Sequence, residues 1–328
     1  MKALVFTGIR ELQLQDVPEP QPGAPDYVLV KVEASGICGS DLHGYTGETG
    51  RRQPPLIMGH EAAGTVIRTG ADVTDLKAGD RVAIHPLRTV DGRRSLMGMN
   101  EPGAYAEYVA WPAGNLYPLP DGLSFERAAL AEPLAVAVRA AGRIPVTPGG
   151  SVLVVGAGPI GLLVAQVLRQ RGWENVLVSD LAAPRLGAAR ELGFTALNAA
   201  PAPAFREAVH GLTDGRGVDA AFEAVGTGPA VSQALQALRY GGSAVWVGNN
   251  HRLIELDMQD VVTRELSIHG TYGLGEDDFR VALGLLAGGA VDSGPLISRR
   301  APLSEGPALF EELLASPELI KGMFLPGS

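Results

Sequence analysis

The residues best suited to chemistry lie near the amino terminus, around the only cysteine of the chain. Cys38 opens the segment Cys-Gly-Ser-Asp-Leu-His at 38–43, and Gly-His-Glu follows at 59–61. A single cysteine excludes an internal disulfide and any zinc site built from paired cysteines. One thiolate, one imidazole and nearby carboxylates are instead suited to a catalytic zinc site with one open coordination position.

A second segment of this kind is the glycine-rich turn at 156–161, which lies between an apolar strand and an apolar helix. Gly156 permits a sharp turn, Gly158 lets the backbone approach a pyrophosphate, and Gly161 lets helix and strand close up. Pro159 and Ile160 carry the turn into the helix, whose free N–H groups favour phosphate. The pattern predicts a dinucleotide site, and a metal together with a dinucleotide points to hydride transfer.

The acidic residue after the next predicted strand indicates which dinucleotide binds. Asp180 can accept hydrogen bonds from both hydroxyls of the adenosine ribose, and its charge would repel a 2′-phosphate. Arg185 follows five residues later and can cover the adenine face. These residues favour NAD over NADP.

The elements that must position these residues change in type along the chain. Before residue 120 we expect strands and turns, including strands at 27–32, 64–67 and 79–84. Ser124 is a predicted helix N-cap, and Pro133 is expected to break the helix that follows, beside Glu132.

From Ser151 onward, short apolar strands alternate with helical segments, which is typical of a parallel sheet covered by helices. Helices are predicted at 184–192 and 230–239, and near the carboxyl end at 277–287 and 305–315, before a short strand at 321–325. The six predicted strands of a complete doubly wound sheet are 152–155, 176–179, 195–197, 220–224, 244–247 and 266–270.

Length, composition and charge define the broad class. The 328 residues predict two domains, and 46% hydrophobic with 19% charged residues is typical of a globular protein. A net charge of -9 disfavours nucleic acid and anionic membrane as partners. The uncharged stretch between Arg143 and Arg169 contains glycine and proline breaks, so we expect a strand, a turn and a helix instead of a membrane span. Low cysteine usage without a secretory signal predicts a cytoplasmic protein.

Four motifs, met in this order, resemble the zinc-dependent medium-chain dehydrogenases: the segment at 38–43, Gly-His-Glu-Ala-Ala-Gly at 59–64, Ala-Glu-Pro-Leu-Ala at 131–135 and the glycine turn. The resemblance is strongest to the polyol, threonine and butanediol dehydrogenases, in which Glu-Pro-Leu replaces a second cysteine. It implies an α/β fold with two domains. A GroES-like catalytic domain with a partly closed β-barrel would comprise 1–128 and 274–328, and a Rossmann domain for NAD would comprise 129–273.

The resemblance also implies roles for individual residues. Cys38 and His60 would bind the catalytic zinc, and either Glu61 or Glu132 would supply the third protein ligand. Sequence does not rank the two carboxylates, since Glu132 could simply cap a turn and Glu61 could orient the site from behind. Ser40 would take the proton of the alcohol and His43 would relay it outward, unless His43 is an ordinary surface histidine. Asp41 is expected to hold local backbone, and Tyr45 and Arg51 are expected beside the substrate.

The chain departs from many relatives at 85–103, where a lobe with four cysteines would bind a structural zinc. This segment is short and has no cysteine, and it carries Arg88, Arg93 and Arg94 instead. We therefore expect one catalytic zinc per chain and no structural zinc. A shortened lobe would also admit larger substrates.

These observations favour a zinc-dependent enzyme that transfers hydride between NAD and the secondary alcohol of a polyol or sugar. The first alternative is a zinc-free reductase of a carbonyl or quinone, which would not need the ligand pattern. The second is a non-catalytic NAD-binding protein, which would not need Ser40 and His43. A homodimer or homotetramer is expected, with the edge strand near 266–271 as the candidate for pairing between subunits.

Overall fold

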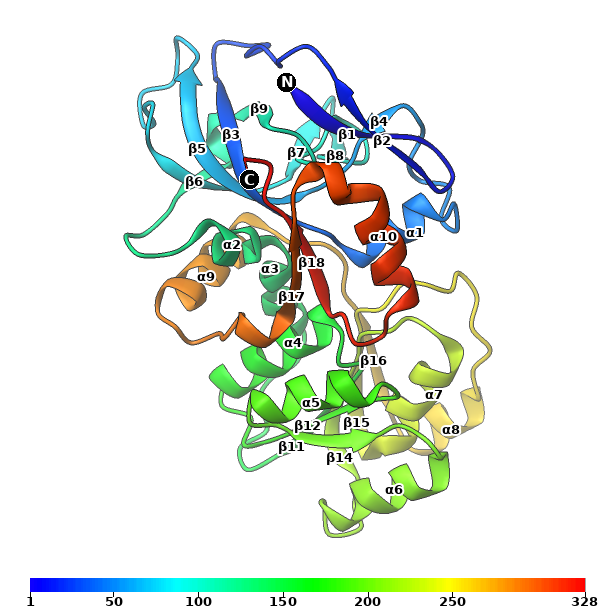
Figure 1. Ribbon diagram of the computed structural model, residues 1–328. Coiled ribbons are helices and arrows are strands. Elements are labelled where there is room, and N and C mark those ends of the chain that lie inside the picture. The colour runs from blue at the N-terminus through cyan, green and yellow to red at the C-terminus, as the bar shows by residue number, and fades with distance from the viewer. Residues whose placement is uncertain (328) are drawn as a thin grey trace. The chain divides into compact units, whose positions relative to one another are not determined.

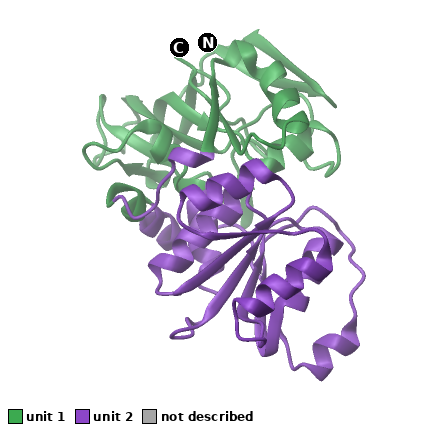
Figure 2. Ribbon diagram, turned by 60° about the horizontal axis from the view of Figure 1, so that its bottom comes forward, with its two compact units in different colours: residues 1–132, 283–288, 297–328 green, residues 133–282, 289–296 purple. Residues whose placement is uncertain are grey.

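The computed structural model describes residues 1–327, and its chain forms two compact units (Figure 2). Unit 1 contains residues 1–132 and 283–288 and the chain from Ile297 onward, and unit 2 contains residues 133–282 and 289–296. Unit 1 is therefore assembled from both ends of the sequence.

The centre of unit 2 is a parallel sheet with the strand order β13-β12-β11-β14-β15-β16. Every residue of β11 is buried, as expected for a strand covered on both faces. The prediction of a doubly wound α/β sheet is confirmed, strand by strand. The strands are β11 (Ser151–Val155), β12 (Asn175–Asp180), β13 (Thr195–Asn198), β14 (Val218–Glu223), β15 (Leu238–Trp246) and β16 (Ser267–Gly270).

Helices lie along both faces of this sheet (Figure 1). On one face, α6 and α7 bury Phe205 and Val231 in the same core cluster as Leu153 of β11. On the other face, α4 packs against β11 and β12 and approaches Val154 through Gly161. The helices that follow the strands are α4 (Pro159–Gln170), α5 (Ala183–Glu191), α6 (Ala202–Gly211), α7 (Gly228–Ala237) and α8 (Met258–Thr263), and α9 (Glu276–Ala287) comes after the last strand of the sheet.

The uncharged stretch folds as predicted into β11, the glycine turn and α4. Within residues 1–327, no helix combines the length and the apolar character that crossing a membrane requires.

The main sheet of unit 1 has the strand order β10-β6-β5-β3-β18-β17, and β9 also pairs with β3. Its core contains Val30, Val66 and Trp111. A smaller sheet, β2-β1-β4, and the hairpin β7-β8 complete the strands. The bounds are β1 (Lys2–Gly8), β2 (Glu11–Asp16), β3 (Tyr27–Gly36), β4 (Leu56–Ile57), β5 (Glu61–Thr69), β6 (Arg81–Ile84), β7 (Leu87–Val90), β8 (Arg93–Leu96), β9 (Tyr108–Pro112), β10 (Leu116–Pro118), β17 (Ile297–Ala301) and β18 (Lys321–Phe324).

The carboxyl end of the chain enters this sheet through β18, which pairs with β3 (Figure 1). The register places Met323 opposite Gly36. The helix α10 (Gly306–Ala315) precedes β18 and buries Leu309 and Phe310 in a cluster with Leu4 and Phe6 of β1. The two chain ends thus share one core.

The predicted break of the helix is found at Leu130, three residues before Pro133. The helix α2 (Phe125–Ala129) ends before α3 (Ala131–Ala141) begins, and Pro133 lies in the first turn of α3, where no backbone N–H is needed. The Ser124 side chain accepts a hydrogen bond from the N–H of Arg127, as an N-cap does.

The limits of the two units differ from the predicted domain limits mainly at α9. We expected residues 274–328 to belong to the first domain, but most of α9 lies in unit 2. The first turn of α9 is tied to α3, because Arg139 donates a hydrogen bond to Asp278 over 3.3 Å. Its last turn is tied to α2, because Arg127 donates to the carbonyl of Leu286 over 2.6 Å. One helix is therefore shared between the units.

Candidate functional site

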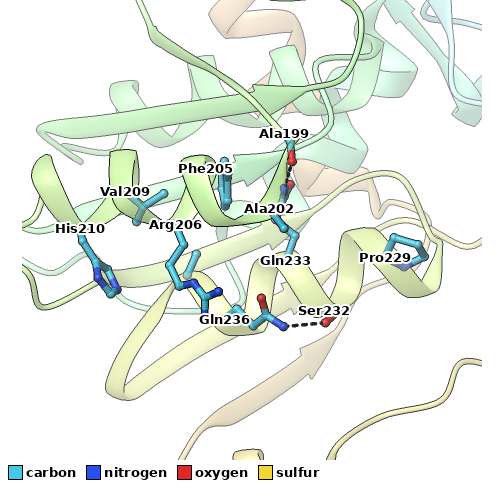
Figure 3. Close-up of a pocket in the computed structure, with 11 residues that line it drawn as sticks. Ala199, Ala202, Phe205, Arg206, Val209, His210, Pro229, Ser232, Gln233 and Gln236 are labelled. Atoms are coloured by element: carbon cyan, nitrogen blue, oxygen red, sulfur yellow. Dashed lines mark hydrogen bonds between the residues drawn. The ribbon is translucent and has the colours of Figure 1, made fainter.

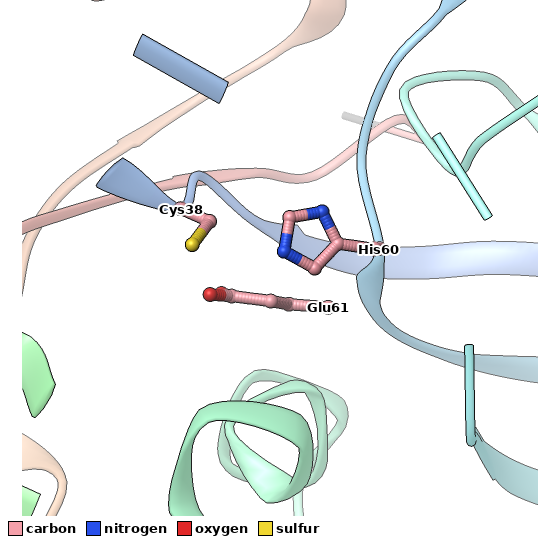
Figure 4. A group of neighbouring side chains, drawn as sticks. All are labelled: Cys38, His60 and Glu61. Carbon is pink, nitrogen blue, oxygen red and sulfur yellow. The ribbon is translucent and has the colours of Figure 1, made fainter. Parts of the chain in front are cut away.

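Three of the predicted metal ligands gather in unit 1: Cys38, His60 and Glu61 (Figure 4). One ligand atom from each side chain lies within 4.8 Å of the other two. The pairing of β3 with β5 explains why these three side chains lie close together. Gly36 at the end of β3 lies opposite Glu61 at the start of β5, so the residues that follow β3 meet those that begin β5.

Local backbone geometry fixes the direction of each ligand. Cys38 is the N-cap of the helix α1 (Gly39–Tyr45), directly after β3. Gly59 has a φ of +95°, and a Cβ there would lie 2.4 Å from the Tyr105 ring. A glycine before His60 is therefore required both by its conformation and by the lack of space.

The donor set fits a zinc ion. Sulfur, imidazole nitrogen and carboxylate oxygen are the atoms that bind zinc in catalytic sites, and three protein ligands leave a fourth position open. His60 and Glu61 are buried, whereas Cys38 is half-buried. Burial alone would lower the pKa of His60, but the neighbouring Asp41 raises it well above its usual range. A metal ion would have to displace that proton, because only the neutral imidazole coordinates.

Asp41 lies beside this cluster and contacts His60. Its fully buried carboxylate lies 3.6 Å from Nδ1 of His60, and it accepts hydrogen bonds from Arg52 over 2.6 Å and from the Tyr105 hydroxyl over 2.7 Å. Burial would raise the pKa of Asp41, but Arg52 and His60 hold it well below its usual range. The predicted backbone role is confirmed, since Asp41 also accepts from the N–H of Cys38 over 3.2 Å. Its place beside His60 also suits Asp41 to orient that ring.

The two candidate carboxylates differ in their partners. Glu61 belongs to the cluster, and its Oε2 lies 2.5 Å from Nζ of Lys321. Glu132 lies in the first turn of α3 and is outside the group of three. Burial, opposed in part by His60, raises the pKa of Glu132 to about 7. Glu61 and Glu132 therefore both interact electrostatically with the buried ammonium of Lys321.

Lys321 is the residue of this site that sequence reasoning missed. Its side chain is 1% exposed, and besides the ion pair with Glu61 it donates a hydrogen bond to the carbonyl of Ile37 over 3.1 Å. A lysine inside the apolar run Ile-Lys-Gly-Met-Phe at 320–324 was the available signal, because a lysine is almost never buried without a partner.

The predicted proton-relay residues both lie on α1. Ser40 is exposed, and its Oγ accepts a hydrogen bond from Arg52 over 3.2 Å. Nδ1 of His43 lies 2.6 Å from Oε2 of Glu48, and its side chain is 31% exposed. His43 therefore reaches solvent while held by a carboxylate.

Tyr45 lies in the core of unit 1, so our expectation that it contacts the substrate is wrong. Its residue exposure is 2%, and its hydroxyl donates to Glu311 over 2.8 Å. The Tyr45 ring packs edge-on against Phe310, at 5.1 Å between centroids. Position along α1 pointed to the substrate, but the side chain turns toward α10.

The predicted dinucleotide turn lies in unit 2 between β11 and α4. Gly156 has a φ of +100°, which L side chains rarely adopt. A Cβ on Gly161 would lie 1.7 Å from the carbonyl oxygen of Gly156, so only glycine fits there. Gly158 is the N-cap of α4, with open space at its Cβ position, and Pro159 and Ile160 begin the helix.

Asp180 ends β12, the parallel neighbour of β11, and therefore lies at the same sheet edge as the turn. Its Oδ2 accepts from the N–H of Ala157 over 2.7 Å, and its Oδ1 accepts from Ala182 over 2.8 Å. These bonds fix the carboxylate beside the turn. Arg185 lies in α5, which begins three residues after Asp180, and is half-buried.

A cavity of about 280 Å³ lies between α6 and α7 in unit 2 (Figure 3). Apolar Phe205 and Val209 line it together with Arg206, His210 and Gln236. None of the predicted site residues contributes to its wall.

The segment that replaces the cysteine-containing lobe forms the hairpin β7-β8, with Asp91 and Gly92 at its tip in left-handed conformations. Nε of Arg88 donates to Glu101 over 2.8 Å, and Ser95 donates to the same carboxylate. The Arg88 guanidinium also lies 5.3 Å from the centroid of Trp111. An ion pair stacked on an aromatic ring thus anchors the hairpin.

Comparison with known proteins is consistent along the whole chain. Residues 24–121 match the family model described as the alcohol dehydrogenase GroES-like domain, and residues 159–288 match the model described as zinc-binding dehydrogenase. A sorbitol dehydrogenase of Bacillus subtilis is 34% identical to the chain, over 99% of the chain and 97% of the relative.

Solved structures give the same result. The 2R,3R-butanediol dehydrogenase from Bacillus subtilis superimposes with a TM-score of 0.90 at 30% identity, over 99% of each chain. A protein of Sinorhizobium meliloti 1021 described as a zinc-binding dehydrogenase, crystallised bound to NADP, also gives a TM-score of 0.90 at 30% identity, over 99% of each chain.

Proposed function

Since the chain belongs to the zinc-binding dehydrogenase family, and is therefore an oxidoreductase, we propose that it transfers hydride between a secondary alcohol and NAD with one zinc ion per chain. The observation that carries this proposal is the cluster of Cys38, His60 and Glu61, whose ligand atoms lie within 4.8 Å of one another.

Cys38, His60 and a carboxylate would hold the zinc, with Glu61 as the third ligand and Glu132 as the residue able to replace it. The ion would polarise the substrate hydroxyl as a Lewis acid. Asp41 would hold the His60 ring in its ligating orientation through the 3.6 Å contact with Nδ1. The fully buried Asp41 carboxylate compensates the charge of Arg52 and can hold its position without water.

Ser40 and His43 would carry the proton that the alcohol loses. Ser40 is exposed two residues from Cys38, so its hydroxyl can accept a proton close to the metal ligands. His43 lies one helical turn further along α1 and reaches solvent, and its contact with Glu48 holds the ring in place.

NAD would bind at the turn that contains Gly156, Gly158 and Gly161, with its pyrophosphate at the amino end of α4. Its nicotinamide would accept or return the hydride. Asp180 would bind the adenosine ribose and Arg185 would cover the adenine. The similar structure from Sinorhizobium meliloti contains NADP. The charge of Asp180 disfavours a 2′-phosphate, so a comparison of activity with NAD and with NADP tests this assignment directly.

The proposed substrates are polyols or sugars. The names of two similar proteins, a sorbitol dehydrogenase and a 2R,3R-butanediol dehydrogenase, support this class. Both alcohols carry a secondary hydroxyl beside a second hydroxyl group. The short hairpin β7-β8 would leave room for a long polyol.

We also propose a homodimer or homotetramer in which β16 pairs with its copy. β16 is an edge strand of the parallel sheet, and of the residues that precede and follow it in the sequence, Leu253, Met258 and Tyr272 are 87%, 72% and 62% exposed. Pairing would cover an open edge that otherwise risks uncontrolled association.

Metal content per chain, measured by plasma mass spectrometry on protein purified without added metal, tests the proposal. We expect close to one zinc per chain, NAD reduction with polyols, and loss of both in Cys38→Ser. Folded protein that contains no zinc and does not respond to added zinc would contradict the proposal and favour the zinc-free reductase.

A further inference from the structure

A buried ion pair crosses the centre of the unit 1 sheet next to the metal cluster. Glu61 lies on β5 and Lys321 on β18, and these two strands are the neighbours of β3 on opposite sides. The carboxylate and the ammonium meet above the last residues of β3. Both side chains are 1% exposed, so neither charge is compensated by water.

Gly36 is the residue of β3 that makes this crossing possible. It pairs with Glu61 on one side and with Met323 of β18 on the other. A Cβ on Gly36 would lie 2.1 Å from Oε2 of Glu61 and 3.0 Å from Cε of Lys321. Any larger side chain would therefore occupy the space through which the two charges meet.

The shortest contact of the ammonium is with one oxygen of the carboxylate, Oε2 of Glu61. A carboxylate has two oxygens, so Glu61 can contact Lys321 and serve the metal cluster together. The carbonyl of Ile37 accepts a hydrogen bond from the same ammonium. Lys321 is thus fixed at two points, and it fixes Glu61 in turn.

The charges around the metal cluster explain why the ion pair of Glu61 and Lys321 is buried. With zinc bound, a thiolate at Cys38 and the Glu61 carboxylate would together balance the two positive charges of the ion, and any negative charge on Glu132, whose pKa is raised to about 7, would be left over. The ammonium of Lys321 supplies the missing positive charge. A buried carboxylate without such a partner would be costly, and its position would no longer be fixed.

We propose that Lys321 is a positioning residue that holds the Glu61 carboxylate in place as a ligand of the metal cluster. This inference rests on the proposed function, since it assigns a role toward the zinc ion. It predicts that the last strand of the chain, far from the metal-binding motifs in sequence, controls metal affinity.

The test compares zinc affinities, measured by competition with a chromophoric chelator, in wild-type protein and in Lys321→Met. We expect affinity to fall about 10- to 100-fold, as is typical when a residue supporting a metal ligand is removed. Lys31→Met is the matched control, because Lys31 forms an ion pair with Glu33 at 38% exposure on β3 itself. Its zinc affinity should be unchanged.

Gly36→Ala separates the pair while it keeps both charges, and it is the second variant should Lys321→Met fail to fold. It should lower zinc affinity in the same direction. With cobalt in place of zinc, the visible absorption bands of either variant should shift, because they report the ligand set and not the overall fold.

A double-mutant cycle shows whether Lys321 acts through Glu61. In the Glu61→Gln background, Lys321→Met should have little further effect on zinc affinity. An effect as large as in the wild-type background, or unchanged affinity in both Lys321→Met and Gly36→Ala, would overturn the inference and leave the proposed function intact. Wild-type protein that binds no zinc would overturn the proposed function and this inference with it.

Discussion

The metal cluster and the dinucleotide turn are built in opposite ways. The turn and its acid, from Gly156 to Asp180, come from one strand, one helix and the next strand along the chain. The cluster combines residues 38, 60 and 61 with a lysine at 321. The first is fixed by local conformation and the second by the pairing of β5, β3 and β18.

This difference determines which kind of substitution should disrupt binding at each site. At the turn, one added methyl group collides with backbone, as at Gly161. At the cluster, an added methyl group collides with side chains, as at Gly36, and the removal of a charge or a ligand matters while the strands stay paired. Variants of one site should therefore leave the other intact.

The largest effect is expected from Cys38→Ser, which removes the thiolate ligand. We expect kcat/KM for a polyol to fall by about 1,000-fold or more, because Lewis-acid catalysis contributes several kcal/mol. The dissociation constant for NAD, followed by quenching of protein fluorescence, should change less than about twofold. Weakened NAD binding would break the proposed independence of the two sites.

Gly161→Ala should produce the converse result. The added Cβ must displace the carbonyl of Gly156, so we expect the dissociation constant for NAD to rise by about 100-fold, which corresponds to about 2.8 kcal/mol. Zinc content should stay at the wild-type value. Gly187→Ala in α5 is the control, because its Cβ meets nothing within 4 Å and should leave NAD binding unchanged.

Asp180→Asn removes the charge at the turn without changing its shape. Because hydrogen bonds to a charged group contribute about 1.5–3 kcal/mol, the ratio of kcat/KM with NADP to that with NAD should rise by about 10-fold. Steady-state rates with both cofactors measure this ratio. An unchanged ratio would show that Asp180 does not select the cofactor.

The smallest effect is expected at the hairpin β7-β8, where Glu101 forms an ion pair with Arg88 outside the metal cluster. Burial would raise the pKa of Glu101, but hydrogen bonds from Arg88 and Ser95 lower it below its usual range. A lowered pKa in the folded state stabilises the protein above the unfolded pKa of about 4.3. That contribution is lost as pH falls through the folded value.

Glu101→Gln should accordingly lower the free energy of unfolding by about 1 kcal/mol at pH 7. Thermal unfolding followed between pH 7 and pH 3 should show the difference from wild type shrinking below about pH 5. Addition of a chelator should not change this difference in stability between the two proteins. A gap between the two proteins that grows as pH falls would contradict the role given to Arg88.

Much of the fold could be predicted because its signals are local. The strands of the parallel sheet are apolar runs, Ser124 and Pro133 mark the ends of helices, and the glycine turn is steric. Tyr45 shows the limit of this reasoning. Its position on α1 suggested the substrate, but its direction depends on contacts with α10, which lies far away in sequence.

The metal cluster illustrates the same limit. The resemblance to a known family identified Cys38, His60 and two carboxylates, but it did not separate Glu61 from Glu132. The structure distinguishes them by their neighbours, since Glu61 joins the cluster and pairs with Lys321. No pattern around Glu61 contains that lysine.

The sequence by itself determined the element order, the glycine turn with Asp180, and the residue types available to a metal ion. Each of these depends on conformational preferences or chemistry carried by neighbouring residues. Only the tertiary structure decided that Lys321 meets Glu61 over Gly36, that Asp41 supports His60, and that α9 is shared between units. These contacts depend on which strands pair and in which register, and pairing is fixed by burial across the whole sheet instead of by any short segment.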